Sequence, residues 1–200
     1  MVKKVLTDIH RYWFGGLNSP TDTVAPEQVK TWFEPTKEVD EHIRDTFGKY
    51  LEAAKETEWD VDNLSRMEQV GLVILLDQFP RQIHRDDGDA FAYDEKALSI
   101  ARRLLAAGPQ RFWPAERTFV FLPFEHSENL ADQDYAVLLF AAEAVAAPPD
   151  AKDGLRMALD YATKHRDIIR KFGRFPHRNV MLGRESTAEE VEFLKRGRGF

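Results

Sequence analysis

The chain has 200 residues, a net charge of −6 at pH 7, 43% hydrophobic residues and 12% aromatic residues. This length and composition suit a soluble globular protein with a sizeable core, and the acidic balance argues against broad nucleic-acid binding. The absence of cysteine excludes disulfides, zinc thiolate sites and cysteine nucleophiles.

The N-terminal segment has the pattern of a first helix. Apolar residues recur at helical spacing from Val2 to Trp13, and Gly15 and Gly16 are expected to end this helix. Polar residues such as Asp8 interrupt the segment, so it lacks the apolar run of a secretory signal. No segment of the sequence approaches the roughly 18 consecutive apolar residues that a membrane span needs. We therefore expect a cytoplasmic protein that does not bind a membrane.

Two further helices are expected before residue 55. After a loop rich in Gly, Pro, Ser, Thr and Asn, Pro26 is suited to open a short helix that carries Trp32 and Phe33. Residues 39–54 then show an apolar stripe at helical spacing, with charged residues on the opposite face. This pattern is typical of an amphipathic helix that covers a core.

A long buried helix is predicted from residue 64 onward. Its segment 71–76 is apolar on every side, which is typical of a helix at the centre of a core. A buried strand is the alternative, and the helical spacing before residue 71 disfavours it. Asp60, Asp62 or Asn63 is expected to cap its start, and Pro80 is expected to stop it.

The middle of the chain predicts one helix and one ambiguous segment. Asp94 is expected to cap a helix over residues 97–105 that Gly108 ends. Residues 119–124 form the one plausible strand, and a short helical turn is an equal alternative because the segment contains Pro123.

The last third predicts three helices. Ser127 or Asn129 starts the first of them, Gly173 ends the second, and capping boxes at Ser186 and Thr187 precede the third. With no alternating strand–helix pattern and no internal repeat, we predict an all-α fold: a compact array of about seven or eight helices in one domain, residues 1–200.

Three polar motifs fall at helix ends rather than on helix faces. The first is DQFPR, the second is FEHSE with a glutamine beyond it, and the third is RFPHRN. Their candidate ligand-binding residues are Asp77, Arg81, His126, Glu128, Gln133, Arg174, His177, Arg178 and Asn179.

These motifs carry a family resemblance. The phrases LLDQFPR, PFEHSENLADQ and FGRFPHRNVMLGRESTAEEVEFL resemble those of the bacterial family catalogued as domain of unknown function 924, and the likeness covers most of the chain. The resemblance implies an all-helical fold similar to tetratricopeptide-like arrays. It implies no established activity.

The first motif allows a structural and a functional interpretation. Asp77 and Arg81 are four residues apart, the spacing of an ion pair on a continuous helix, but Pro80 is expected to break that geometry. Asp77 either anchors a helix end through hydrogen bonds or lines a pocket. The structural role is the favoured one, since ion-pair networks imitate active sites.

The second motif contains the pair His126 and Glu128. A His-x-Glu pair also occurs in zinc deaminases, but these need a downstream cysteine pair that this chain lacks. With His177, the pair would offer nitrogen and oxygen ligands to a metal, yet their spacing matches no known metal loop. We therefore predict no metal. The structural alternative is that His126 and Ser127 cap a helix.

The third motif gathers basic residues among aromatic ones. Its arginines either bind an anionic ligand in bidentate fashion or neutralise Asp77, Glu125 and Glu128 in an internal network. The sequence does not separate these two interpretations. No glycine-rich phosphate loop or nucleophile elbow is present, so no cofactor is predicted.

Three functions follow from these motifs. The first is a binding module for a small anionic ligand or peptide, with Arg81, Arg174 and Arg178 supplying charge and with no nucleic-acid partner. The second is an enzyme in which His126 or His177, with Glu128 as a further candidate, acts in acid–base chemistry. The third is a helical scaffold for another protein, in which the motifs are structural. The oligomeric state and the meeting of the motifs in space stay open.

Overall fold

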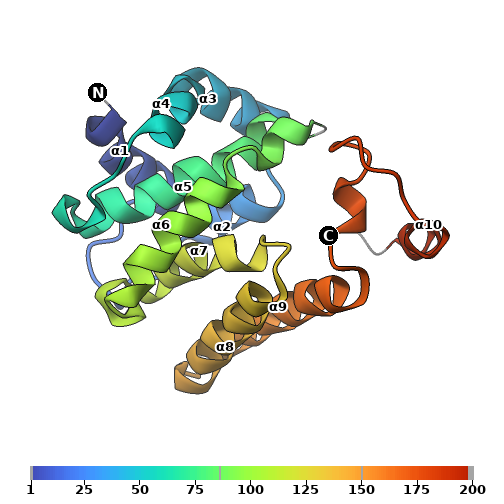
Figure 1. Ribbon diagram of the computed structural model, residues 1–200. Coiled ribbons are helices and arrows are strands. Elements are labelled where there is room, and N and C mark those ends of the chain that lie inside the picture. The colour runs from blue at the N-terminus through green and yellow to red at the C-terminus, as the bar shows by residue number, and fades with distance from the viewer. Residues whose placement is uncertain (1, 86, 150, 198–200) are drawn as a thin grey trace. The chain divides into compact units, whose positions relative to one another are not determined.

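Helices account for all regular secondary structure in the part of the chain that the computed structural model describes, residues 2–85, 87–149 and 151–197 (Figure 1). The all-α prediction is therefore confirmed. The chain divides into two compact units, one of Met1–Arg85 and Asp89–Pro123 and the other of Asp86–Gly88 and Phe124–Phe200. The prediction of a single domain stays a prediction.

The first unit contains the helices up to α7. Within the described residues they are α1 (Val2–Phe14), α2 (Pro26–Phe33), α3 (Lys37–Phe47), α4 (Leu51–Glu56), α5 (Arg66–Ile83), α6 (Asp94–Ala106) and most of α7 (Pro114–Glu125). The second unit contains α8 (Leu130–Ala146), α9 (Lys152–Phe172) and α10 (Ala188–Lys195). Short helices such as α4 bring the described elements above the seven or eight expected.

Helix α5 is the centre of the first unit, as its apolar sequence predicts. Helices α1, α3, α4 and α6 all pack on it. Residues 69–77 are buried without interruption, so the helix has no solvent face over more than two turns. The closest approach is at Gly71, where an added Cβ atom would lie 2.1 Å from the carbonyl oxygen of Leu6 in α1. Glycine is thus required at this crossing because any side chain would meet backbone.

An aromatic cluster fills the space between α1, α2, α5 and α7. The ring of Trp13 lies 5.7 Å from that of Phe79 and 5.4 Å from that of Phe119, in edge-to-face orientation. The ring of Trp32 lies 4.7 Å from that of Phe119. Such edge-to-face pairs add to the stabilisation that burial of large rings provides.

The second unit is built on the pair α8 and α9, which lie side by side along their lengths (Figure 1). Its core cluster contains Ile168 and Ile169 of α9 together with Phe175, and Phe172 and Phe193 pack against it. The connection after α9 and the helix α10 are therefore attached to the end of α9 by apolar contacts.

Several predicted helix ends are confirmed. The side chain of Asn129 caps α8 by accepting a hydrogen bond from the backbone of Ala131, and Thr187 forms a capping box with Glu190 at α10. Gly173 ends α9 in the left-handed conformation, with φ of 70°.

Two predicted caps are wrong. Ser65, not Asp60, Asp62 or Asn63, caps α5, because it forms a capping box with Glu68, whereas residues 61–63 form a separate 3₁₀ turn. Asp94 is the first residue of α6 and provides no cap; its carboxylate binds Arg81 instead.

Pro80 does not stop α5, which continues to Ile83. The turn after the proline is held by a hydrogen bond from the backbone of His84 to the Pro80 carbonyl (2.8 Å) and by burial of Ile83. Proline removes a hydrogen bond to the turn before it, and the helix continues because the turn after it is buried and hydrogen-bonded. The expected break between Asp77 and Arg81 is therefore also wrong.

Residues 119–124 are helical and belong to α7. The helix starts at Pro114, where the side chain of Glu116 accepts a hydrogen bond from the backbone N–H of Trp113 (2.8 Å). This contact satisfies a backbone N–H at the start of the helix. The helical alternative for residues 119–124 is therefore the correct one. No helix in the described residues is long and apolar enough to cross a membrane.

Candidate functional site

The second and third motifs lie in the same unit, and their side chains meet there. The first motif belongs to the other unit. Convergence of the first motif with the other two therefore stays a prediction.

In the first motif, Arg81 is bound to carboxylates of its own unit. Its guanidinium makes a bidentate contact with Asp94 of α6, at 2.7 and 2.9 Å, and lies 3.8 Å from the buried carboxylate of Asp77. It also donates a hydrogen bond to the Asp77 carbonyl (2.6 Å). These contacts fasten the end of α5 to the start of α6, as the structural interpretation of the motif predicts.

In the second motif, Gln133 connects two helices. Its side-chain amide donates hydrogen bonds to the carbonyl oxygens of Glu125 (2.6 Å) and Ser127 (2.7 Å), which are left without helical partners after the end of α7. Ser127 in turn donates to Asp132 at 2.8 Å. His126 is half-buried in this turn. Gln133 thus has a structural role in the second unit.

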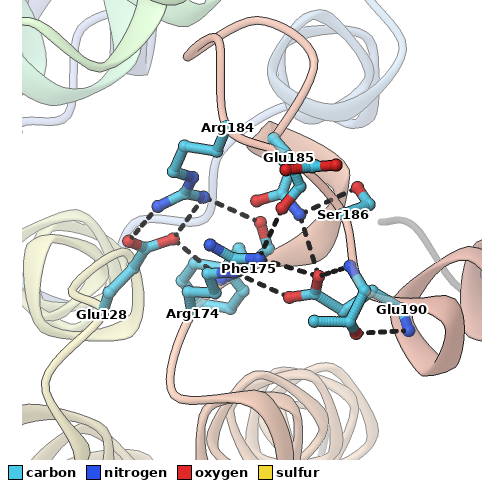
Figure 2. A network of polar contacts seen from close by, with 9 residues as sticks. Glu128, Arg174, Phe175, Arg184, Glu185, Ser186 and Glu190 are labelled. Atoms are coloured by element: carbon cyan, nitrogen blue, oxygen red, sulfur yellow. Dashed lines mark hydrogen bonds and ion pairs between the residues drawn. The ribbon is translucent and has the colours of Figure 1, made fainter.

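Glu128 brings the second and third motifs together (Figure 2). It accepts a bidentate contact from Arg184, at 2.7 and 3.0 Å, and a hydrogen bond from the backbone N–H of Phe175 at 2.7 Å. Burial alone would raise the pKa of Glu128, but the hydrogen bonds from Arg184 and Phe175 outweigh it and lower the pKa. The carboxylate is therefore ionised at neutral pH and holds the loop after α9.

Arg174 makes the second ion pair of this network. Its guanidinium contacts both carboxylate oxygens of Glu190, at 2.7 and 2.8 Å, and the carbonyl of Glu185 at 2.8 Å (Figure 2). Asn179 donates to Glu190 (3.3 Å) and to Ser186 (3.0 Å). The buried carboxylate of Glu190 thus joins the RFPHRN motif to α10.

His177 lies beside the buried ring of Phe175, which His165 and Arg178 also contact. The ring centroid of Phe175 lies 5.5 Å from that of His177 and 5.6 Å from that of His165, and the guanidinium of Arg178 lies 4.5 Å from it. Burial, followed by the charges of Arg178, His165 and Arg184, lowers the pKa of His177 to about 4. His177 is therefore neutral at pH 7 in a positively charged setting.

The Glu190 pair predicts a specific acid sensitivity. The hydrogen bond from Arg174 is the main cause that lowers the pKa of Glu190 from 4.5 to about 2. Because the folded-state pKa is depressed, the stabilisation is fully present above pH 4.5 and is lost as the pH falls towards 2. We expect the amide-exchange protection of α10, corrected for intrinsic rates, to fall across this range.

The matched variant for this prediction is Glu190→Gln. It should show weak protection of α10 already at pH 6, with little further loss on acidification. A variant with the same pH profile as the native chain would assign the acid sensitivity to another group.

Sequence reasoning missed two histidine contacts. His165 lies on the buried side of α9, 2.9 Å from Glu125 at the end of α7. In the first unit, the buried His10 lies 2.5 Å from the buried Glu116, which also binds Arg66 and the backbone of Trp113. The position of His10 in the sequence could have indicated its burial, because His10 follows Leu6 by four residues in the apolar stripe of α1.

Among the described residues, no group of three or more His, Asp or Glu side chains is arranged to hold a metal ion. Of the three residues considered above as metal ligands, two have contacts of another kind. Glu128 binds an arginine, and His177 packs on an aromatic ring.

Comparison with known proteins identifies a family whose function is unknown. A family model described as a bacterial protein of unknown function (DUF924) matches residues 9–198. A solved structure of a protein of unknown function, ATU0120 from Agrobacterium tumefaciens, is similar, with a TM-score of 0.79 and 31% sequence identity over 98% of this chain and 100% of that chain. No curated protein matches the chain.

Proposed function

Because the chain belongs to the DUF924 family of bacterial proteins of unknown function, its activity has to be argued from its own residues, and we propose that the second unit binds a small anionic ligand. The ligand class is a carboxylate or phosphate, free or at the end of a peptide. The site would centre on His177 and Arg178, with Glu128, Arg174 and Asn179 as its frame.

The charge around His177 carries this proposal. Arg178 and Arg184 act on it as positive charges, and Glu128 is the one carboxylate among the groups that shift its pKa. The low pKa of His177 is caused first by burial and then by positive charge, chiefly that of Arg178, which Glu128 only partly offsets. An anion bound there would relieve the repulsion and be held by guanidinium groups, which suit oxyanions.

Arg174 of the third motif and Arg184 beyond it serve the frame. Arg174 and Arg184 each make a bidentate contact with a glutamate of the same unit. Such pairs position the loop of residues 173–185 and leave little of their charge for a ligand. For Asp77, Arg81, His126 and Gln133, a contribution to ligand binding stays a prediction.

Binding is favoured over acid–base catalysis by the same observation. A histidine with a pKa of about 4 is a weak base at neutral pH, whereas efficient general bases have pKa values near the working pH. Neutral His177 would instead donate or accept one hydrogen bond to orient the ligand.

A nuclear magnetic resonance titration tests the proposal. We expect phosphate or acetate to raise the pKa of His177 by about one unit or more, since tenfold tighter binding to the protonated form shifts a pKa by one unit. His177→Gln identifies the signal. Arg178→Gln should abolish the response, and Arg178→Lys should keep part of it.

Sodium chloride at equal ionic strength is the control for screening. A His177 pKa that responds equally to chloride, or equally in Arg178→Gln, would rule out a specific anion site. Circular dichroism of each variant verifies that α8, α9 and α10 remain folded.

Two further expectations from the sequence belong to this proposal. One is a cytoplasmic location. The other is the tetratricopeptide-like stacking that the family resemblance implies, which would suit a protein that binds peptide ends. Both rest on the sequence.

A further inference from the structure

Helix α8 carries an exposed apolar stripe. The residues Ala131, Tyr135, Leu138, Ala142 and Val145 are all exposed, with Leu138 at 63% and Val145 at 85%. Their spacing of four, three, four and three residues is that of the apolar seam of a coiled coil. The stripe contains no charged residue. The opposite face of α8, with Ala136 and Phe140, is buried.

A seam with this spacing is shaped for another helix. Side chains at alternating intervals of three and four residues insert between those of a helix that runs nearly parallel or antiparallel to them. The stripe therefore points to a helical occupant rather than to a small molecule.

We propose that the occupant is the same stripe of a second copy of this chain, in antiparallel orientation. Reversal about Leu138 places residues whose numbers add to about 276 opposite each other. Tyr135 then faces Ala142, and Val145 faces Ala131, so every large side chain except Leu138 meets a small one. Read in the opposite direction, the stripe therefore places small side chains against large ones. A two-fold interface requires a surface that fits itself in this way.

The charge beside the stripe is compatible with this pairing. Asp134 borders the stripe, and it lies 3.5 Å from Arg170 and 4.0 Å from Arg166 of α9. These contacts offset its negative charge, so two copies of α8 do not meet as two unscreened acidic surfaces.

The exposed area of the stripe is small for a dimer interface, so the dimer is expected to be weak. With about 200 Å² for a fully exposed large side chain, the stripe offers on the order of 400 Å² per copy, and stable complexes bury about 800 Å² per partner. We therefore expect a weak dimer whose formation depends on protein concentration.

Single-cysteine crosslinking tests the arrangement cleanly because the chain has no cysteine of its own. Under mild oxidation, Leu138→Cys should form a disulfide-linked dimer rapidly, since the two sulfur atoms would meet at the axis. Val145→Cys alone should not, because antiparallel helices hold these residues about 21 Å apart. A mixture of Ala131→Cys and Val145→Cys should give the mixed dimer.

The control is Val180→Cys, at a position of the same unit that is 87% exposed and outside the stripe. Equal crosslinking of Val180→Cys and Leu138→Cys would mean random collision and would overturn the proposal. Rapid crosslinking of Val145→Cys to itself would indicate a parallel pair and would overturn the antiparallel arrangement.

Analytical ultracentrifugation of the unmodified chain provides the independent readout. We expect its average mass to rise with concentration, and Leu138→Glu to remain monomeric with unchanged helical circular dichroism. An unmodified chain that stays monomeric at the highest soluble concentration would refute the dimer.

Discussion

Replacement of Gly71 by alanine lowers the free energy of unfolding of the first unit by about 3 kcal/mol or more, at the upper end for an overpacked core. The added Cβ would lie 2.1 Å from the carbonyl oxygen and 2.9 Å from the carbonyl carbon of Leu6. These are backbone atoms, so no side-chain rotation can relieve the contact. Helix α1 would have to move away from α5, and the aromatic cluster around Trp13 would open with it.

Gly154→Ala is the matched control. Gly154 also lies in a helix, near the start of α9, and no atom lies within 4 Å of an added Cβ. We expect this variant to be neutral or more stable by up to about 1 kcal/mol, the ordinary gain of alanine over glycine in a helix.

Denaturant unfolding followed by tryptophan fluorescence measures the effect selectively. All four tryptophans, Trp13, Trp32, Trp59 and Trp113, belong to the first unit. Because Gly154 belongs to the second unit, Gly154→Ala is followed by far-ultraviolet circular dichroism. If the tryptophan signal of Gly71→Ala unfolded at the same denaturant concentration as that of the unmodified chain, the close approach of α1 and α5 would be absent from the protein in solution.

Features that depend on short spacings could be predicted from the sequence. The apolar run of α5 is continuous in sequence, and the cap of α8 at Asn129 and the capping box of Thr187 with Glu190 each involve residues within one helical turn. Gly173 likewise follows from local geometry, since it ends α9 with a positive φ. Such features need only backbone periodicity and the hydrogen-bonding needs of helix ends.

Features set by tertiary contacts were mistaken or missed. Pro80 is a helix breaker by local rules, and α5 continues past it because the turn after it is buried and hydrogen-bonded. Residues 119–124 carry β-branched and aromatic residues that fit a strand, and the core places them in α7. In both cases packing outweighs local preference.

The candidate site shows the same division. The motifs were found because polar residues cluster at helix ends, but their partners lie far away in sequence. Glu128 and Arg184 are 56 residues apart, and His10 and Glu116 are 106 apart. No spacing rule relates such pairs, so the sequence left open whether the arginines bind a ligand or neutralise glutamates. Arg184 neutralises Glu128, one of the carboxylates named by the second interpretation, whereas Arg174 neutralises Glu190, a partner that the sequence did not indicate.

Removal of the Glu116 carboxylate tests how much the first unit depends on such a distant pair. Glu116 is fully buried and accepts hydrogen bonds from His10, Arg66 and the backbone of Trp113. Burial alone would raise its pKa, but these hydrogen bonds outweigh burial and lower the pKa, so the group is ionised at neutral pH. Loss of one member of a buried charged pair costs about 3–5 kcal/mol, and we expect Glu116→Ala to fall within this range.

The control variant also loses a carboxylate from an ion pair, but that pair is exposed to solvent instead of buried. Asp8 of the first unit lies 3.7 Å from Arg11, but both side chains are 64% exposed, so Asp8→Ala should change stability by about 0.5 kcal/mol or less. Glu116→Gln should fall between the two variants, because it keeps the size and one acceptor oxygen but loses the charge that Arg66 binds. The same denaturation experiment applies, since Arg66 stacks on Trp113 at 3.5 Å. Equal stability of Glu116→Ala and Asp8→Ala would show that the buried carboxylate and its three contacts contribute no more to the first unit than an exposed ion pair does.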